Sequence, residues 1–122
     1  MSKEIEIKNA VIKSAYISND NHGILDAGLS LDYGGTCQHF GGYALYIPKG
    51  FKHHSLQSVA GHFIWRIMEI AGVGEWSELV GKTIRVKASW SAVYAVGHIV
   101  KNDWFCPEKD FSKLIAENEE EA

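Results

Sequence analysis

The segment that most constrains the fold is an alternating stretch followed by two glycines. Apolar residues occupy every second position from 25 to 33, namely Leu25, Ala27, Leu29, Leu31 and Tyr33, and small or polar residues lie between them. A period of two is typical of a β-strand with one buried face and one polar face. Gly34-Gly35 follows at once, and both glycines tolerate the positive φ of a two-residue turn. The stretch predicts a β-hairpin whose second strand runs from Thr36 to about Ile47.

A two-residue turn at Gly34-Gly35 also fixes which residues face each other. On the core side we expect Leu29 opposite Phe40 and Leu25 opposite Ala44. On the polar side we expect Asp32 opposite Cys37, Ser30 opposite His39, Gly28 opposite Gly41 and Asp26 opposite Tyr43. A slip of one residue would turn all these side chains to the other face, so the structure tests this register directly.

The residues before this hairpin predict another strand, from Glu4 to Ile17. Ile5 and Ile7 share one parity, whereas Ile12 and Tyr16 share the other. A bulge near Asn9 would produce that change of phase. The residues from 19 to 23 are typical of a turn.

The second half of the chain predicts one long helix and a second hairpin. Apolar residues recur at helical spacing from about Leu56 to Ala71, and Gly72 suits the left-handed position just past a helix. Alternating segments at 83–89 and 92–101 suggest the second hairpin, and 111–117 suggests a short helix. We therefore expect an α+β fold, in which an antiparallel sheet of about five strands (β-β-β-α-β-β in sequence) packs on one long helix.

Composition limits the classes of protein that remain. The 122 residues are 46% hydrophobic, as in one globular domain, and we place that domain at 1–116 with an acidic tail at 117–122. The net charge of −3 comes mainly from four glutamates in the last six residues, so the rest is nearly neutral and nucleic-acid binding is disfavoured. The chain has no signal-peptide pattern and no long apolar run. We expect a cytoplasmic protein, off the membrane, with both cysteines free.

Two chemical hypotheses arise from the side chains, and neither has a strong motif. Six histidines and two cysteines offer metal ligands, but the nearest spacings are Cys37-x-His39 and His53-His54, which match no usual zinc motif. The expected register also puts Cys37 and His39 on one face with Asp32, as a nucleophile, a base and an orienting carboxylate would be. No nucleophile elbow accompanies them. We therefore predict no metal, no cofactor and no catalytic residue.

The glycines and aromatic residues lead to a further pair of alternatives. Gly28 and Gly41 would leave space over the sheet, either for a ligand contacting Asp26, Asp32, His39 and Tyr43 or for a core side chain such as Trp65. Most aromatic residues are expected in the core. Trp90, beside the second hairpin turn, and Trp104, next to Asp103, are the best candidates for the surface.

Several short strings resemble those of a small uncharacterised protein family of tailed bacteriophages and prophages. They are His22-Gly23-Ile24-Leu25, Leu31-Asp32-Tyr33-Gly34-Gly35, Phe40-Gly41-Gly42-Tyr43-Ala44-Leu45, Ala60-Gly61-His62-Phe63-Ile64-Trp65 and Gly97-His98-Ile99-Val100-Lys101-Asn102-Asp103-Trp104-Phe105. The family has no known activity, so the resemblance transfers no catalytic residue. It implies a phage-type accessory protein acting inside a bacterial cell.

Three classes of function remain after these arguments. The first is a protein that binds a host protein, as an inhibitor of a bacterial defence system, through Arg66, Trp90 and Trp104 as anchors. The second is a small-molecule or nucleotide binder that uses the glycine-aromatic groove, and the third is a small hydrolase. Self-association through Trp90 and Trp104 is the competing explanation for those two residues.

Overall fold

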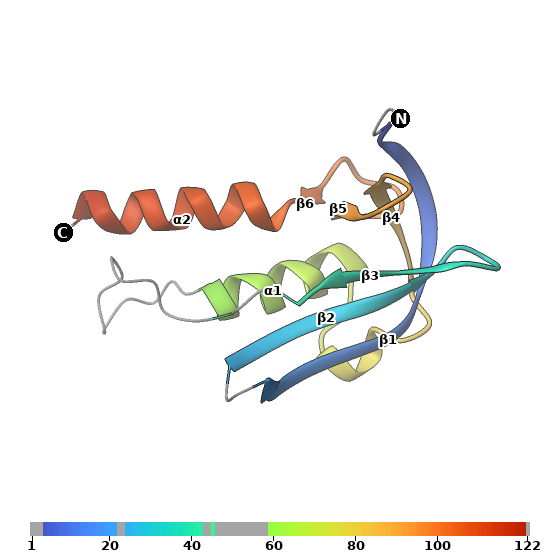
Figure 1. The fold of residues 1–122 in the computed structure, drawn as a ribbon, viewed down its shortest axis with the longest axis horizontal. Helices are drawn as coiled ribbons and strands as arrows, with labels where there is room; N and C mark the ends of the chain where they lie inside the picture. The colour runs from blue at the N-terminus through green and yellow to red at the C-terminus, as the bar shows by residue number, and fades with distance from the viewer. Residues whose placement is uncertain (1–3, 22–23, 43–44, 46–58, 122) are drawn as a thin grey trace.

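The fold is α+β, as the sequence predicts, with more elements than expected. The computed structural model describes residues 4–21, 24–42, 45 and 59–121. Six antiparallel strands form one sheet, and two α-helices and a 3₁₀ turn accompany it (Figure 1). The elements are β1 (Glu6–Asn21), β2 (Ile24–Asp32), β3 (Cys37–Gly41), α1 (Val59–Ala71), η1 (Trp76–Glu78), β4 (Thr83–Ala88), β5 (Val93–Gly97), β6 (Trp104–Phe105) and α2 (Pro107–Glu121).

The sixteen-residue strand β1 organises the sheet. The strand order is β3-β2-β1-β4-β5-β6, so β1 joins two halves of the sheet. Its first part, from Glu6 to Val11, pairs with β4, and its later part, from Val11 to Asn21, pairs with β2. Figure 1 shows β1 bending strongly between these partners. The bend curls the sheet around one face of α1.

The predicted bulge near Asn9 is wrong. Pairing between β1 and β4 is continuous from Glu6 to Val11, and the irregularity in β1 lies between Ile12 and Ser14, opposite β2. The change of parity at Asn9 needs no bulge, because Ile5 and Ile7 are 57% and 59% exposed on the outer face. The later irregularity has the larger effect, since it leaves Ile12 in the core and turns Tyr16 to the outer face.

The register predicted for the hairpin of β2 and β3 is confirmed over its described part. The observed pairs are Gly28–Gly41, Leu29–Phe40, Ser30–His39, Leu31–Gln38 and Asp32–Cys37. Tyr43 and Ala44 lie outside the described residues, so the pairs of Asp26 and Leu25 are not part of this result. Beyond Gly42, the amide of Leu45 donates to the carbonyl of Leu25 over 2.8 Å. This contact is one residue out of the earlier register, and it follows Gly41 and Gly42, whose φ angles are positive.

The core is built on a cluster of phenylalanine rings that joins distant elements. Phe40 of β3, Phe63 of α1 and Phe105 of β6 are at most 1% exposed, and their ring centroids lie 5.7 to 6.4 Å apart. Because β3 and β6 are the two edge strands, the Phe40–Phe105 contact shows that the curled sheet brings its edges together. Phe111 of α2 packs against this cluster.

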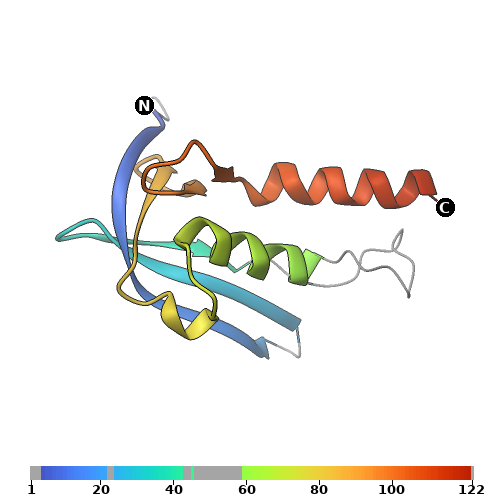
Figure 2. The same cartoon turned by 180° about the vertical axis from the view of Figure 1, so that it is seen from behind.

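The helices differ from expectation at the C-terminal end. Helix α1 ends as predicted, since Gly72 has φ of +73° and the amides of Gly72 and Val73 both donate to the Met68 carbonyl. The second hairpin is confirmed as β4 and β5, although β5 ends at Gly97 and not near Lys101, and β6 was not foreseen. The expected short helix at 111–117 is α2, which starts earlier, at Pro107, and runs alongside α1 (Figure 2). Pro107 as first residue and two acids in the first turn are a helix-start signal in the sequence.

Candidate functional site

The outer face of β1, β2 and β3 carries a tyrosine–histidine pair over a glycine. The hydroxyl of Tyr16 lies 2.8 Å from Nε2 of His39, and their rings are stacked with centroids 5.7 Å apart. A Cβ atom on Gly28 would lie 2.8 Å from each of those two atoms. The glycine therefore lets both side chains lie flat across the middle strand.

Tyr16 and His39 occupy the space over Gly28 that we expected to hold a ligand or Trp65. Trp65 is 64% exposed on α1 and does not cover Gly28, so that expectation is wrong. It failed because α1 packs on the inner face of the sheet, with Leu29 and Leu31, whereas the space over Gly28 is on the outer face. Tyr16 was not foreseen as the partner, since the predicted bulge position kept it on the core side.

The four residues predicted to contact a ligand are only partly brought together. His39 is exposed in its pair with Tyr16, and Asp26 lies near enough for its charge to act on that phenol. Burial, followed by the charge of Asp26, raises the pKa of Tyr16 above its ordinary 10.0. Asp32 lies at the far end of the hairpin, and Tyr43 is outside the described residues.

Two of the three side chains expected of a hydrolase are bound to other groups. Oδ1 of Asp32 accepts a hydrogen bond of 2.8 Å from the Gly34 amide and so stabilises the turn. Nε2 of His39 is engaged by Tyr16. Cys37 is exposed at the start of β3, where it lines a hollow that Trp90 also lines.

Trp90 is the most exposed large apolar side chain in the described chain, at 96%. It sits in the turn between β4 and β5, which the hydrogen bond of 2.8 Å from the Ser89 amide to the Ala92 carbonyl closes. Nε2 of Gln38 donates to the carbonyls of Ser89 and Trp90, over 3.1 Å each. These hydrogen bonds hold the backbone of the turn against β3, and the Trp90 indole takes no part in them.

Hydroxyl groups fix the same turn from its other side. The Ser89 hydroxyl lies 3.1 Å from the Tyr94 hydroxyl and 3.2 Å from the Ser91 hydroxyl, and it accepts a hydrogen bond from the Ser91 amide. Ser89 is only 6% exposed. The tip of the hairpin is therefore held by hydrogen bonds of the protein's own side chains.

Two shallow hollows flank Trp90 and have Lys8 and Ser89 in common. One, of about 190 Å³, extends along the start of β3 to Cys37. The other, of about 250 Å³, extends along the start of β1 to Glu4 and Glu6. Together they make an uneven surface around a projecting indole.

Arg66, predicted as an anchor for a partner, is engaged within the molecule. Its Nη2 donates to Oδ1 of Asp103 over 2.8 Å and to the Trp104 carbonyl over 3.0 Å, and its Nη1 donates to Glu69 over 2.9 Å. The side chain is 16% exposed. The hydrogen bond with Asp103 raises the pKa of Arg66, although burial acts in the opposite direction.

Trp104, the third predicted anchor, lies on the outer face of the sheet against Gly97, which it faces across β5 and β6. A Cβ atom on Gly97 would come within 2.5 Å of the indole ring, so the ring rests on the backbone there. Lys87 and Arg85 of β4 lie over the same ring. Trp104 is half-buried, so only part of its indole ring is exposed and the side chain does not project from the surface.

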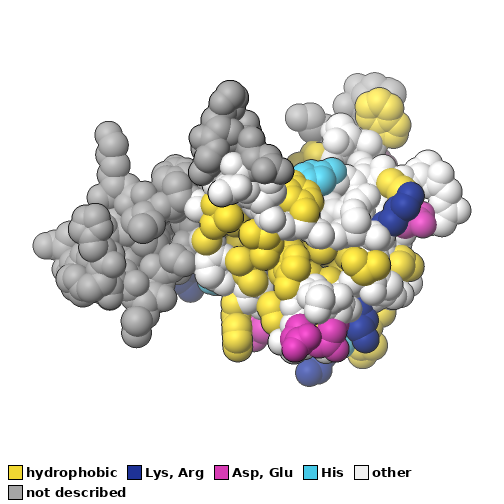
Figure 3. Space-filling model, turned by 90° about the horizontal axis from the view of Figure 1, so that it is seen from below, with side chains coloured by type: hydrophobic (Ala, Val, Ile, Leu, Met, Phe, Trp, Pro, Cys, Tyr) yellow, Lys and Arg dark blue, Asp and Glu magenta, His cyan; other side chains and the backbone are white. Residues whose placement is uncertain are grey.

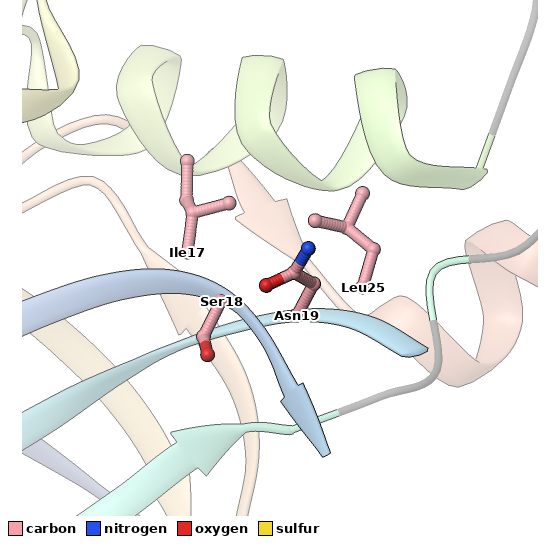
Figure 4. A pocket seen from close by; sticks show the side chains of 4 residues that line it. All are labelled: Ile17, Ser18, Asn19 and Leu25. Carbon is pink, nitrogen blue, oxygen red and sulfur yellow. The ribbon is translucent and has the colours of Figure 1, made fainter. Parts of the chain in front are cut away.

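A further hollow of about 370 Å³ lies near the end of β1 and is lined by Ile17, Ser18, Asn19 and Leu25 (Figure 4). Ile17 and Leu25 point toward α1, and Ser18 points the other way. None of these four side chains titrates near neutral pH, so the hollow offers no acid–base group of its own. Seen from below the view of Figure 1, apolar side chains form a band with charged side chains along part of its border (Figure 3).

Three further findings concern metal ligands, membrane-spanning helices and similarity to known proteins. No group of three or more possible metal ligands occurs among the residues that the structure describes. Over the same residues, no helix has the length and apolar character to cross a membrane. No family model, no curated protein and no solved structure matches this chain.

Proposed function

We propose that this protein acts by binding a partner protein, with Trp90 as the central anchor. The observation that carries the proposal is an indole that is 96% exposed on a backbone that is held in place. Anchors of protein interfaces are most often tryptophan, tyrosine or arginine, and they contribute most when little order must be gained on binding.

The polar surroundings of Trp90 support the same conclusion. Gln38, Ser89, Ser91 and Tyr94 order the turn without using the indole. The Trp90 indole packs against little of its own fold, so a contribution to stability does not explain why a tryptophan occurs at this position. The hollows on both sides would admit side chains of a partner around the ring.

The partner that we propose is a protein of a bacterial host, and the proposed effect is inhibition of a defence system. This part rests on the resemblance to small phage proteins and on an interface size that a domain of 122 residues can supply. A standard interface needs only about 800 Å² from each partner. Arg66 and Trp104 are less suitable anchors than expected, because both are engaged within the fold.

The test compares two tryptophan variants of the whole protein. Tagged wild type, Trp90→Ala and Trp65→Ala are used to capture proteins from bacterial lysate, and the affinity of each captured protein is then measured with purified components. Trp65 is the matched control because it is also a largely exposed indole, at 64%. We expect Trp90→Ala to weaken binding at least about thirtyfold and Trp65→Ala to leave it nearly unchanged.

Melting temperature and phage growth complete the test. Trp90→Ala should leave the melting temperature unchanged, because the indole packs against little. In defended strains, wild type should restore plaque formation and Trp90→Ala should not. Equal binding by both variants, or no captured protein at all, would contradict the proposal.

A further inference from the structure

We propose that the hollow between β5, β6 and the start of α2 is a binding site for a small aromatic anion. The hollow has a volume of about 450 Å³ and lies on the outer face of the sheet, and Trp90 does not line it. Sites for small molecules commonly have volumes of about 300 to 1,000 Å³. This inference is independent of the protein partner proposed above.

The walls of the hollow are apolar and aromatic. Tyr94, Ala95 and Trp104 line it, and Ile5 borders it although this side chain is 57% exposed. Trp104 is held flat by its contact with Gly97. A planar apolar ligand would cover Ile5 and contact rings that are already in place, so binding would cost little ordering.

Two cationic side chains near the hollow, Lys87 and Arg85, lie over the Trp104 ring. They indicate that a ligand would be an anion. Nζ of Lys87 lies 4.4 Å from the centroid of the Trp104 ring, and Cζ of Arg85 lies 5.0 Å from it. Arg85 donates to the neutral carbonyls of His98 and Lys101, over 2.7 and 2.8 Å. Within the described chain, neither cation forms an ion pair with a carboxylate.

Two lysines and two carboxylates line the hollow, so the position of each charge decides which charge faces a ligand. Lys109, Glu108 and Asp110 also border it, from the first turn of α2. Asp110 is bound to His62 over 2.7 Å, which directs its carboxylate toward α1. Lys109 offsets Glu108, so Lys87 remains as the cation that faces a ligand. A ligand with a carboxylate or sulfonate group on an aromatic ring would match both the positive charge of Lys87 and the aromatic side chains that line the hollow.

The probe for this site is anilinonaphthalene sulfonate, an aromatic anion whose fluorescence rises when it leaves water. We expect saturable binding of one equivalent to the wild-type protein, and displacement by benzoate. Lys87→Gln should weaken binding by about tenfold, because it removes a charge-assisted contact. Lys82→Gln is the matched control, since it removes the same charge from just before β4 and does not line the hollow.

Two more measurements distinguish this site from general adhesion to apolar surface. Uncharged phenylnaphthylamine should bind more weakly than the sulfonate and should not respond to Lys87→Gln. Ile5→Ser, at an exposed position, should weaken both probes without lowering the melting temperature. Non-saturable binding, or equal effects of Lys87→Gln and Lys82→Gln, would overturn the proposal. Trp90→Ala should leave probe binding unchanged, so this test and that of the protein partner fail separately.

Discussion

At the scale of single residues, Gln38 connects parts of the fold that are far apart in sequence. Its Oε1 accepts a hydrogen bond of 2.6 Å from the Tyr33 hydroxyl, while its Nε2 donates to two carbonyls of the turn between β4 and β5. Strand β3 is an edge strand and is not paired with β4 or β5. One amide side chain thus holds the curled sheet across its open side.

Gln38→Ala should therefore lower the free energy of unfolding by about 1 to 3 kcal/mol, because it leaves partly buried polar groups without partners. Urea unfolding of wild type and variant measures this loss. Gln38→Glu is the informative comparison, since it keeps the size and removes the donor. Ser112→Ala, at an exposed site on α2, is the control. Equal stability of wild type and Gln38→Ala would show that the turn needs no such fastening.

At the scale of elements, two side-chain contacts to carboxylates connect α1 to segments that follow it much later in the chain. Arg66 binds Asp103 in the connection between β5 and β6, and His62 binds Asp110 in α2. His62 and Arg66 occur one turn apart on α1, and both contact Phe105 of β6. The side of the helix next to β6 therefore docks the C-terminal segment of the protein.

The pair of Arg66 and Asp103 predicts a dependence of stability on pH. The hydrogen bond from Arg66 lowers the pKa of Asp103 below its ordinary 3.8, so the charged carboxylate stabilises the folded state. This contribution is complete above 3.8 and is lost as the pH falls through the lowered pKa of the folded protein. Because the Asp103 side chain is 44% exposed, solvent screens the pair and we expect only about 1 kcal/mol.

Urea unfolding of wild type and Asp103→Asn at neutral pH and well below pH 3.8 tests this dependence. The variant should be less stable at neutral pH, and the difference should shrink in acid. Glu4→Gln, an exposed carboxylate at the start of the described chain, is the control and should show little difference at either pH. A difference that persists unchanged in acid would mean that Asp103 acts through packing rather than charge.

At the scale of the whole molecule, the core is large enough to stabilise the fold by itself. Seventeen buried apolar residues form one cluster, which reaches from β1 to β6. Small domains that need a metal usually lack such a core. We therefore expect the protein to fold without a metal ion.

Thermal melting after dialysis against a chelator tests this expectation. The melting temperature should agree with that of the untreated protein and should not rise when zinc is added back. A drop of several degrees that zinc reverses would show that histidines or cysteines of the chain bind a structural metal.

The sequence by itself determined the local features of this protein. Alternation and a pair of glycines specified the register of β2 and β3, because a period of two and a two-residue turn leave no freedom in pairing. Helical spacing and Gly72 specified α1 and its end. These signals act over neighbouring residues and need no knowledge of the remaining chain.

Only the tertiary structure decided which side chains meet across the fold. The irregularity at Ile12 to Ser14 depends on pairing with β2, and it alone brings Tyr16 to His39. Strand β6 has two residues, too few for a periodic pattern, and exists because β5 offers an edge to Trp104 and Phe105. Likewise, Arg66 is engaged because the fold brings Asp103 and the Trp104 carbonyl next to it, whereas the Trp90 indole is left exposed. Long-range pairing therefore decided which candidate residues remain available at the surface.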